Sequence, residues 1–290
     1  LAATLAPLTV SAEDITIPVW EGEATVAKAP ASVVAFDLAA IDTLGALGVT
    51  LDGVPDFKAP AFLEGAMGGV ATMGSLFEPD LEKLAVLGPD LIVAGGRSQE
   101  AVGAMSEVAP TIDMTIWGEG LIDQSKARTS AYGAIFGKEA EADAINAALD
   151  DKIAAVQAAV DGKGAGLIVM ANGGKLSAYG DDSRFGWLHT TTGLPAAFAE
   201  IDPETHGEAI SFEFIADVNP DWILVIDRLA AIGRDGEAAA VTMDNPLVAG
   251  TTAGQNGQII YLDSAPLYLA AGGANAMQIV LDQFVEAFGS

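Results

Sequence analysis

The chain has no cysteine and very few basic residues. Its 290 residues include 13 Lys and Arg against 40 Asp and Glu, which gives a formal net charge of -27 at pH 7. Without cysteine, the protein can form no disulfide framework, thiolate metal site or thiol nucleophile. The acidic balance argues against nucleic acid or an anionic membrane surface as a partner, because either would repel the chain.

Long apolar runs are also missing. No segment approaches the roughly 18 uninterrupted apolar residues that a transmembrane helix requires, so we expect no membrane insertion. Residues 1–12 are small and apolar, and the acidic pair Glu13 and Asp14 follows them. This pattern is typical of the rear half of a secretory signal peptide, and no cysteine follows the expected cleavage point. We therefore expect an exported, soluble periplasmic protein without a lipid anchor at that point.

Side chains with an aromatic nitrogen are scarce. His189 and His206 are the only histidines, too few for the nitrogen-rich site that usually binds a divalent metal directly. Trp117, Trp187 and Trp222 are predicted to pack in the interior, the third within a strand. Neither residue type by itself indicates a functional site.

Motifs of hydrolytic enzymes are missing as well. The chain has no Gly-x-Ser-x-Gly and no His-Glu-x-x-His sequence. With 40 acidic residues, however, some carboxylates will lie close together by chance. An exported hydrolase that uses a carboxylate pair is therefore an alternative of another class, which a screen for turnover would test.

What the chain does contain is a repeat. Residues 81–97, LEKLAVLGPDLIVAGGR, recur 131 positions later at 212–228 as FEFIADVNPDWILVIDR, without a gap. Each copy follows an N-cap candidate (Asp80 or Ser211) and shows helix-period apolar residues, a Gly-Pro or Asn-Pro stop, and a short apolar run ending in arginine. One helix-turn-strand unit is used twice, which predicts two related lobes.

The arginines that end the two copies are expected at binding edges. In open α/β sheets, ligands lie outside the carboxyl ends of the strands. Arg97 and Arg228 would each stand at this edge of its own lobe. Two lobes that face each other would bring both guanidinium groups into one cleft.

A long helix is predicted between the lobes. Residues 137–160 are rich in Ala and place apolar side chains at Ile145, Leu149, Ile153 and Val156. At about 1.5 Å per residue, this helix would run roughly 35 Å. Because the linker is helical and not rich in Gly, Ser and Pro, we expect small adjustments of two fixed lobes rather than a large hinge closure.

The predicted fold class is α/β. Two three-layer lobes with mainly parallel sheets are joined by the single long backbone helix, and the ligand cleft lies between them. The expected divisions are a signal-peptide remnant at 1–12, an N-terminal α/β lobe at 13–136, the linking helix at 137–161, and a C-terminal α/β lobe at 162–290.

Several ordered motifs carry a resemblance to a known family. Together they resemble the periplasmic binding proteins for ferric catecholate siderophores, soluble components of ABC importers, from about Ile15 to the end. The motifs are the two repeats with Gly74–Asp80, Asn172–Gly180, Ser183–Gly186, Thr205–Glu208, Asp244–Val248 and Asn256–Asp263. The resemblance implies a binding protein that delivers its ligand without turnover, and it implies the same two-lobed fold.

The resemblance also implies the site residues. The three cleft arginines of the family fall on Arg97, Arg184 and Arg228, and its metal-ligating histidine and tyrosine fall on His206 and Tyr268. Three catecholates around Fe(III) leave three negative charges, which three guanidinium groups can neutralise. A tetradentate ligand leaves two iron positions open, which an imidazole and a phenolate can fill. Iron is then cargo carried as a siderophore complex, and no intrinsic cofactor is expected.

The chain departs from the family pattern at two places. Gly254 and Gln255 stand where relatives carry an aromatic-basic pair, and Leu267 stands where an aromatic residue precedes the tyrosine. These departures leave the particular ligand open. Haem or a corrinoid bound by the same architecture is the first alternative, although three arginines favour a compact polyanion.

Two acidic residues are matched across the repeat. Glu82 and Glu213 each lie near the start of a predicted helix, where the helix dipole favours an acid by about 0.3 to 1 kcal/mol. In the proteins that the chain resembles, such a pair docks onto arginines of the membrane permease. The sequence therefore predicts a monomeric protein that delivers a ferric siderophore to an inner-membrane ABC permease.

Overall fold

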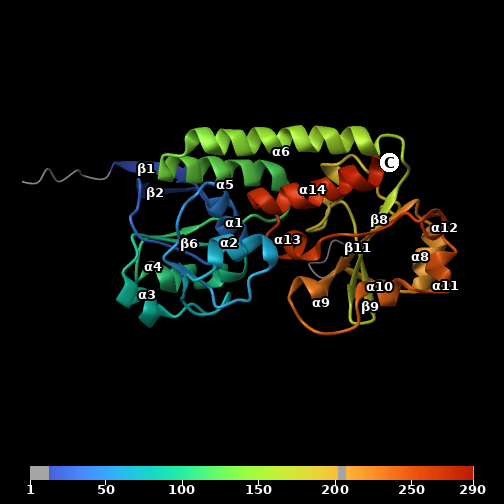
Figure 1. Cartoon of the computed structure of the whole chain (residues 1–290), viewed down its shortest axis with the longest axis horizontal. Helices are drawn as coiled ribbons and strands as arrows, with labels where there is room; N and C mark the ends of the chain where they lie inside the picture. Colours follow the sequence, from blue (N-terminus) through green and yellow to red (C-terminus); the bar gives the residue numbers. More distant parts are fainter. Residues whose placement is uncertain (1–12, 202–206, 290) are drawn as a thin grey trace, which may run out of the picture.

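Two α/β lobes lie side by side. The computed structural model describes residues 13–201 and 207–289. The long helix α6 (Glu139–Val160) runs across both lobes, and the helices α5 (Leu121–Phe136) and α14 (Ala274–Phe288) lie beneath it (Figure 1). The predicted two-lobed α/β fold with a long connecting helix is confirmed.

A five-stranded parallel sheet forms the centre of the first lobe, in the order β5-β4-β3-β6-β7. Its central strands β3 and β6 are buried throughout, as expected for a sheet covered on both faces. The strands are β3 (Val33–Ala35), β4 (Gly53–Val54), β5 (Ala71–Thr72), β6 (Leu91–Ala94) and β7 (Thr111–Asp113). The other elements of this lobe are the antiparallel hairpin β1 (Asp14–Pro18) and β2 (Glu23–Ala27), the 3-10 helices η1 (Ala61–Leu63) and η2 (Gly96–Ala101), and α1 (Leu38–Ala46), α2 (Glu64–Met67), α3 (Leu81–Leu87) and α4 (Val102–Ser106).

The sheet of the second lobe is mixed, in the order β10-β9-β8-β11-β12. Strands β8, β11 and β12 are parallel, whereas β9 and β10 form an antiparallel edge. Gly173 and Gly174 join β8 to β9 with positive φ angles of 57° and 80°, and such a two-residue connection can only form a hairpin. The strands are β8 (Gly166–Asn172), β9 (Lys175–Tyr179), β10 (Glu208–Ile210), β11 (Trp222–Asp227) and β12 (Ile259–Tyr261). The short helices are α7 (Trp187–Thr190), α8 (Phe212–Val218), α9 (Arg228–Ala231), α10 (Ala239–Met243), α11 (Pro246–Ala249), α12 (Thr252–Asn256) and α13 (Ser264–Leu269).

The sequence repeat is a structural repeat. Its copies are α3 with β6 and α8 with β11, and both predicted N-caps accept a backbone hydrogen bond, Asp80 from Lys83 and Ser211 from Phe214. Both helices end on a left-handed residue, Gly88 or Asn219, which is followed by proline as the stop signal predicts.

The repeated Pro-Asp pair has a structural role. The Asp90 carboxylate accepts hydrogen bonds from the backbone N–H groups of Ala31 and Ser32, which lead into β3. The Asp221 carboxylate accepts the equivalent bond from Ala165, which leads into β8. Each copy therefore ties its turn to the start of the neighbouring central strand.

Helix α14 connects the lobes a second time, although the sequence assigned it to the second lobe. The buried carboxylate of Asp42, on α1 of the first lobe, accepts backbone hydrogen bonds from Asn275 and Ala276 at 2.8 and 2.9 Å. At the other end, Phe288 packs on Trp222 in the core of the second lobe, with ring centroids 4.0 Å apart. Both α6 and α14 thus connect the two lobes.

Candidate functional site

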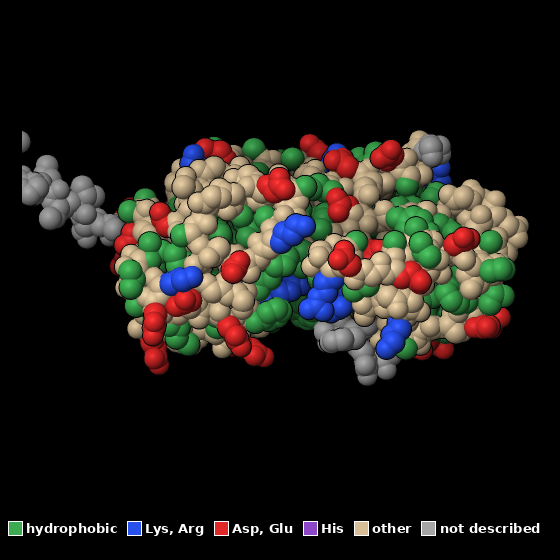
Figure 2. Space-filling model, turned by 60° about the horizontal axis from the view of Figure 1, so that its bottom comes forward, with side chains coloured by type: hydrophobic (Ala, Val, Ile, Leu, Met, Phe, Trp, Pro, Cys, Tyr) green, Lys and Arg blue, Asp and Glu red, His purple; other side chains and the backbone are tan. Residues whose placement is uncertain are grey.

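A cavity of about 530 Å³ lies between the lobes. Both lobes line its wall, including Trp20, Asp37 and Arg97 from the first and Arg184 and Tyr268 from the second half of the chain. Figure 2 shows a hollow between the two halves in which basic side chains gather, on a surface that is otherwise rich in acidic side chains. We refer to this space as the interlobe cavity.

The three predicted arginines come from three different loops. Arg228 is the first residue of α9 and directly follows β11, as the repeat predicted. Arg97 lies in η2, three residues after the last residue of β6. Arg184 lies in the turn between β9 and α7. The fold brings all three to one side chain, Tyr268.

The ring of Tyr268 is surrounded by positive charge. The guanidinium carbons of Arg97, Arg184 and Arg228 lie 5.6, 4.6 and 5.9 Å from its centroid, within the range of cation–π attraction. Arg228 also donates a hydrogen bond from Nε to the Tyr268 hydroxyl at 3.2 Å. A single tyrosine therefore organises the three cations.

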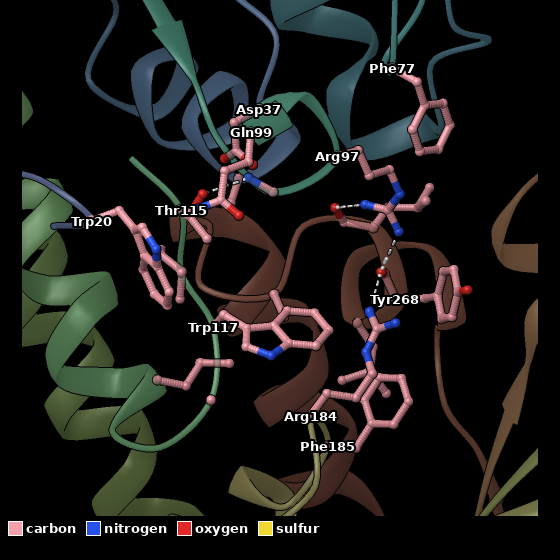
Figure 3. A pocket seen from close by; sticks show the side chains of 18 residues that line it. Trp20, Asp37, Phe77, Arg97, Gln99, Thr115, Trp117, Arg184, Phe185 and Tyr268 are labelled. Atoms are coloured by element: carbon pink, nitrogen blue, oxygen red, sulfur yellow. Dashed lines mark hydrogen bonds between the residues drawn. The ribbon is translucent and has the colours of Figure 1, made fainter. Parts of the chain in front are cut away.

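Backbone carbonyl groups hold two of these arginines in place. Arg97 donates to the carbonyl oxygens of Leu269 and Tyr268 at 3.2 and 3.1 Å, and Arg184 donates to the same Tyr268 oxygen at 3.1 Å (Figure 3). Within residues 13–201 and 207–289, the salt bridges are formed by lysines, and no carboxylate pairs with Arg97, Arg184 or Arg228. Their positive charge remains available to an anion.

This arrangement changes the acidity of Tyr268. Burial would raise its pKa, but the hydrogen bond from Arg228 and the charges of Arg184, Arg228 and Arg97 outweigh that cost, so the pKa lies below its ordinary value. Burial lowers the pKa of Arg97 and Arg184. Both remain cations at neutral pH because an arginine ordinarily titrates above pH 12. The site thus favours negative charge.

Aromatic side chains that the sequence did not assign to the site complete the wall. Trp117 is 42% exposed, lines the cavity and lies 5.1 Å from the guanidinium carbon of Arg184, so its prediction as interior packing was wrong. Trp187 and Trp222 are buried, as predicted. Phe77 is 65% exposed and lies at the rim, in the loop before α3. Hydrophobic periodicity could not identify Trp117 and Phe77 as cavity residues, because both lie in loops.

Of the two predicted metal ligands, only Tyr268 belongs to the described residues. Tyr268 lies at the centre of the site, whereas His206 lies outside the described residues. Among the described residues, no group of three His, Cys, Asp or Glu side chains could hold a metal ion. His189 is buried, with Nδ1 2.9 Å from the carbonyl oxygen of Leu194.

The two departures from the family pattern differ in position. Leu267 lines the interlobe cavity. Gly254 and Gln255 belong to α12, at the far end of the second lobe (Figure 1), and do not line it. The departure at these two residues therefore leaves the cavity wall unchanged.

The matched glutamates are on the surface. Glu82 lies in the first turn of α3 and Glu213 in the first turn of α8, and both are exposed. The backbone N–H of Glu213 and the Ser211 hydroxyl lower the pKa of the Glu213 carboxyl. Each lobe thus presents an acid at the start of its repeated helix. In the part of the chain that the structure describes, no helix is both long and apolar enough to cross a membrane.

Known proteins share this architecture and sequence. The petrobactin-binding protein YclQ of Bacillus subtilis is 38% identical over 256 residues, covering 87% of this chain and 80% of YclQ. The ferric-anguibactin-binding protein FatB of Vibrio anguillarum is 30% identical over 276 residues, covering 93% and 86% of the two chains.

Solved structures agree. The crystal structure of YclQ matches with a TM-score of 0.91 at 35% identity, covering 96% of this chain and 99% of the other. That of the periplasmic catecholate-siderophore binding protein VctP of Vibrio cholerae gives 0.86 at 30% identity, with the same coverage. The model of the periplasmic binding protein family matches residues 33–266. The chain therefore belongs to the periplasmic binding proteins and is, as the sequence predicted, a binding protein and not an enzyme.

Proposed function

We propose that the protein binds an anionic ferric siderophore of the catecholate type in the interlobe cavity and delivers it to an inner-membrane ABC permease. The observation that carries this proposal is the group of three guanidinium cations around Tyr268, none of which has a carboxylate partner among the described residues. The siderophore ligands named for YclQ, FatB and VctP support it.

The charge of the ligand fits the charge of the site. Three catecholates around Fe(III) leave three negative charges, and each guanidinium offers planar donors for their oxygens. The net charge of -27 opposes an anion only weakly, because distant carboxylates are screened beyond a Debye length of about 8 Å at physiological salt. The arginines act in contact with the ligand and are screened much less.

Tyr268 and His206 are proposed as iron ligands for a tetradentate siderophore only. A bis-catecholate leaves two positions on the iron, and a phenolate is a suitable hard donor for Fe(III). The lowered pKa of Tyr268 favours this phenolate form. A hexadentate siderophore would leave no coordination position open on the iron and would be bound through the arginines alone. Iron enters as cargo with the siderophore.

Delivery is proposed to use one acid on each lobe. Glu82 and Glu213 are exposed on the two copies of the repeated helix, where arginines of a permease could reach both. The protein would act as a monomer in the periplasm, and each of its two lobes would present one acid to the permease. The sequence duplication supports this pseudosymmetric contact.

Intrinsic fluorescence provides the test of ligand class. Trp117 is in the cavity wall, so a coloured ferric complex bound there would quench it. The protein would be titrated with ferric tris-catecholates, ferric bis-catecholates, a neutral ferric hydroxamate, haemin and a corrinoid. We expect saturable quenching by the catecholate complexes at lower concentration than by the others. Tighter binding of haemin or the corrinoid would contradict the proposal.

A further inference from the structure

The interlobe cavity has two chemically different ends. At one end Arg97, Arg184 and Tyr268 form the cationic site described above. At the other end, Figure 3 shows Asp37, Gln99 and Thr115 close together, on the side of the cavity where Trp20 lies. We refer to this second group as the Asp37 end. Its chemistry is not explained by binding an anion.

The carboxylate of Asp37 is only partly used by the fold. Asp37 is the N-cap of α1, and its Oδ1 accepts the backbone N–H of Ala40 at 2.8 Å. No side chain of the described residues donates to Oδ2, which lies next to Gly96. A β-carbon at Gly96 would lie 2.9 Å from Oδ2, so glycine keeps this oxygen uncovered. Asn or Ser would cap the helix equally well without placing a charge in the cavity.

The two side chains beside Asp37 at this end, Gln99 and Thr115, offer an acceptor but no cation. The amide nitrogen of Gln99 donates one of its two N–H groups to Asp113 at 3.0 Å, which leaves the amide oxygen and the second N–H for a ligand. The hydroxyl of Thr115 donates to Asp113 at 2.6 Å and accepts from the backbone of Gly96, so it is satisfied. The Oδ2 atom of Asp37 and the amide oxygen of Gln99 are therefore both open to a ligand group that donates hydrogen bonds.

The nearby charges neutralise Asp37 only in part, because the charge of Arg97 lowers its pKa whereas that of Asp113 raises it. Arg97 turns to the carbonyl groups of Tyr268 and Leu269, and the guanidinium of Arg128 donates to the backbone carbonyls of Pro18 and Thr115. Burial raises the pKa of Asp37 to about 6, so the group is ionised at neutral pH but poorly stabilised. A bound cation would supply the missing stabilisation.

The aromatic wall suits a cation as well. Trp20 and Trp117 both line the cavity, and an indole ring is the aromatic surface that attracts a cation best. A protonated amine combines two or three hydrogen-bond donors with a positive charge, and thus matches a carboxylate, an amide oxygen and an indole face together. A neutral hydroxyl would match only the acceptors.

We propose that the Asp37 end binds a protonated amine carried by the same ligand whose ferric centre lies at the arginines. The ligand class is then a ferric catecholate with a cationic arm, and the cavity is matched to it by opposite charges at its two ends. This inference rests on the proposed function, because it presumes that the anionic iron centre occupies the arginine site.

Two matched ligands test the inference. One is a ferric bis-catecholamide whose linker carries a single secondary amine, and the other is the same compound with that amine acetylated. We expect the wild-type protein to bind the amine compound about tenfold more tightly or better, since the amine adds a charge-assisted hydrogen bond to Asp37. Asp37→Asn, which keeps the helix cap, should bind the two compounds with equal affinity. Asp37→Ser is the second variant should the first fail to fold.

A neighbouring acidic pocket provides the matched control. It contains the exposed Glu119 and Asp123, and it shares Gly118 and Leu121 with the interlobe cavity. The variant Glu119→Gln with Asp123→Asn should keep the full preference for the amine. A preference that survives Asp37→Asn, or that disappears in this control instead, overturns the inference and leaves the proposed function standing. If neither complex binds the wild-type protein, the proposed function itself fails.

Discussion

The two copies of the repeated unit deliver their arginines by different routes. In the second copy, β11 continues to Asp227 and Arg228 follows at once. In the first copy, β6 ends at Ala94, and two glycines turn the chain before Arg97. The second of them, Gly96, has a φ of 53° and matches Asp227 in the repeat. Both arginines nevertheless reach the same tyrosine.

The difference extends to the atoms that receive each arginine. Arg97 donates to the backbone oxygens of Tyr268 and Leu269, whereas Arg228 donates to the Tyr268 hydroxyl and, at 3.4 Å, to Asn172. Duplication has therefore preserved the position of the cation and not the backbone that carries it. Charge acts over a distance that tolerates such differences, while a hydrogen bond requires a particular geometry.

Removing either arginine gives the largest expected effect on binding. Arg97→Ala and Arg228→Ala should each weaken binding of a ferric tris-catecholate by roughly 30-fold or more, because a ligand charge left unpaired costs about 2 to 5 kcal/mol. Equal losses would show that the two copies serve the ligand equally. Arg234→Ala is the control, since Arg234 is exposed and is not one of the three arginines over the Tyr268 ring. Unchanged dissociation constants in both Arg97→Ala and Arg228→Ala would contradict the assignment.

Reversing the charges of Glu82 and Glu213 tests whether the two copies of the repeat also act as a pair on the outer surface. Glu82→Lys with Glu213→Lys should leave ligand binding in solution intact and should sharply reduce uptake of the ferric siderophore by cells. The control is Glu139→Lys with Glu141→Lys, which reverses two exposed acids in the first turn of α6 at a similar helix-dipole cost and also removes the exposed ion pair between Glu141 and Lys138. If a folded Glu82 and Glu213 double variant supports normal uptake, both acids have only a structural role.

Tyr268 is the residue on which the two copies meet, and a smaller change there separates its roles. Tyr268→Phe keeps the ring beneath the arginines and removes only the hydroxyl that receives Arg228. We expect the affinity for a tris-catecholate to fall less than about tenfold, the effect of one hydrogen bond. The tyrosinate contribution to the charge-transfer band of a ferric bis-catecholate complex should disappear. Identical spectra of variant and wild type would remove Tyr268 from the iron.

The smallest expected effect comes from substituting the residue that ends each repeated helix by its counterpart in the other copy, Gly88 at the end of α3 and Asn219 at the end of α8. Gly88→Asn should cost less than about 1 kcal/mol of unfolding free energy, because asparagine tolerates the left-handed conformation. Asn219→Gly should cost about 0.5 to 1.5 kcal/mol, because the Asn219 amide oxygen also accepts a hydrogen bond from the backbone of Thr252 at 2.8 Å. Urea denaturation measures both. A stabilised Asn219→Gly variant would show that conformation alone sets the cost.

Sequence periodicity predicted some helices well and missed others. The closing residues 274–288 show a helical pattern in the sequence and form α14, and α6 begins two residues later than predicted. Helix α5 was not predicted as a separate helix. Its buried face includes the polar residues Ser125, Arg128 and Thr129, which hide the apolar spacing of a helix.

The sequence by itself determined the local units: the repeated helix and strand, their caps, and the arginines that follow. These follow from interactions between residues close in the chain, whose periods and stop signals are written in the sequence. The positive charge of the cavity could also be predicted from the sequence, because its arginines lie in motifs that the chain shares with its family. The departure at Gly254 and Gln255 could not be placed from sequence, because the position of α12 depends on the packing of the second lobe.

Only the tertiary structure decided how the site is assembled. Arg97 meets Leu269 across 172 residues, Arg184 meets Tyr268 across 84, and Arg228 meets Tyr268 across 40. No local pattern encodes such contacts, because they form only when two sheets and the helices that join them have packed. The free oxygen of Asp37 arises in the same way, since the sequence shows a helix cap and only the fold places a cavity beside it.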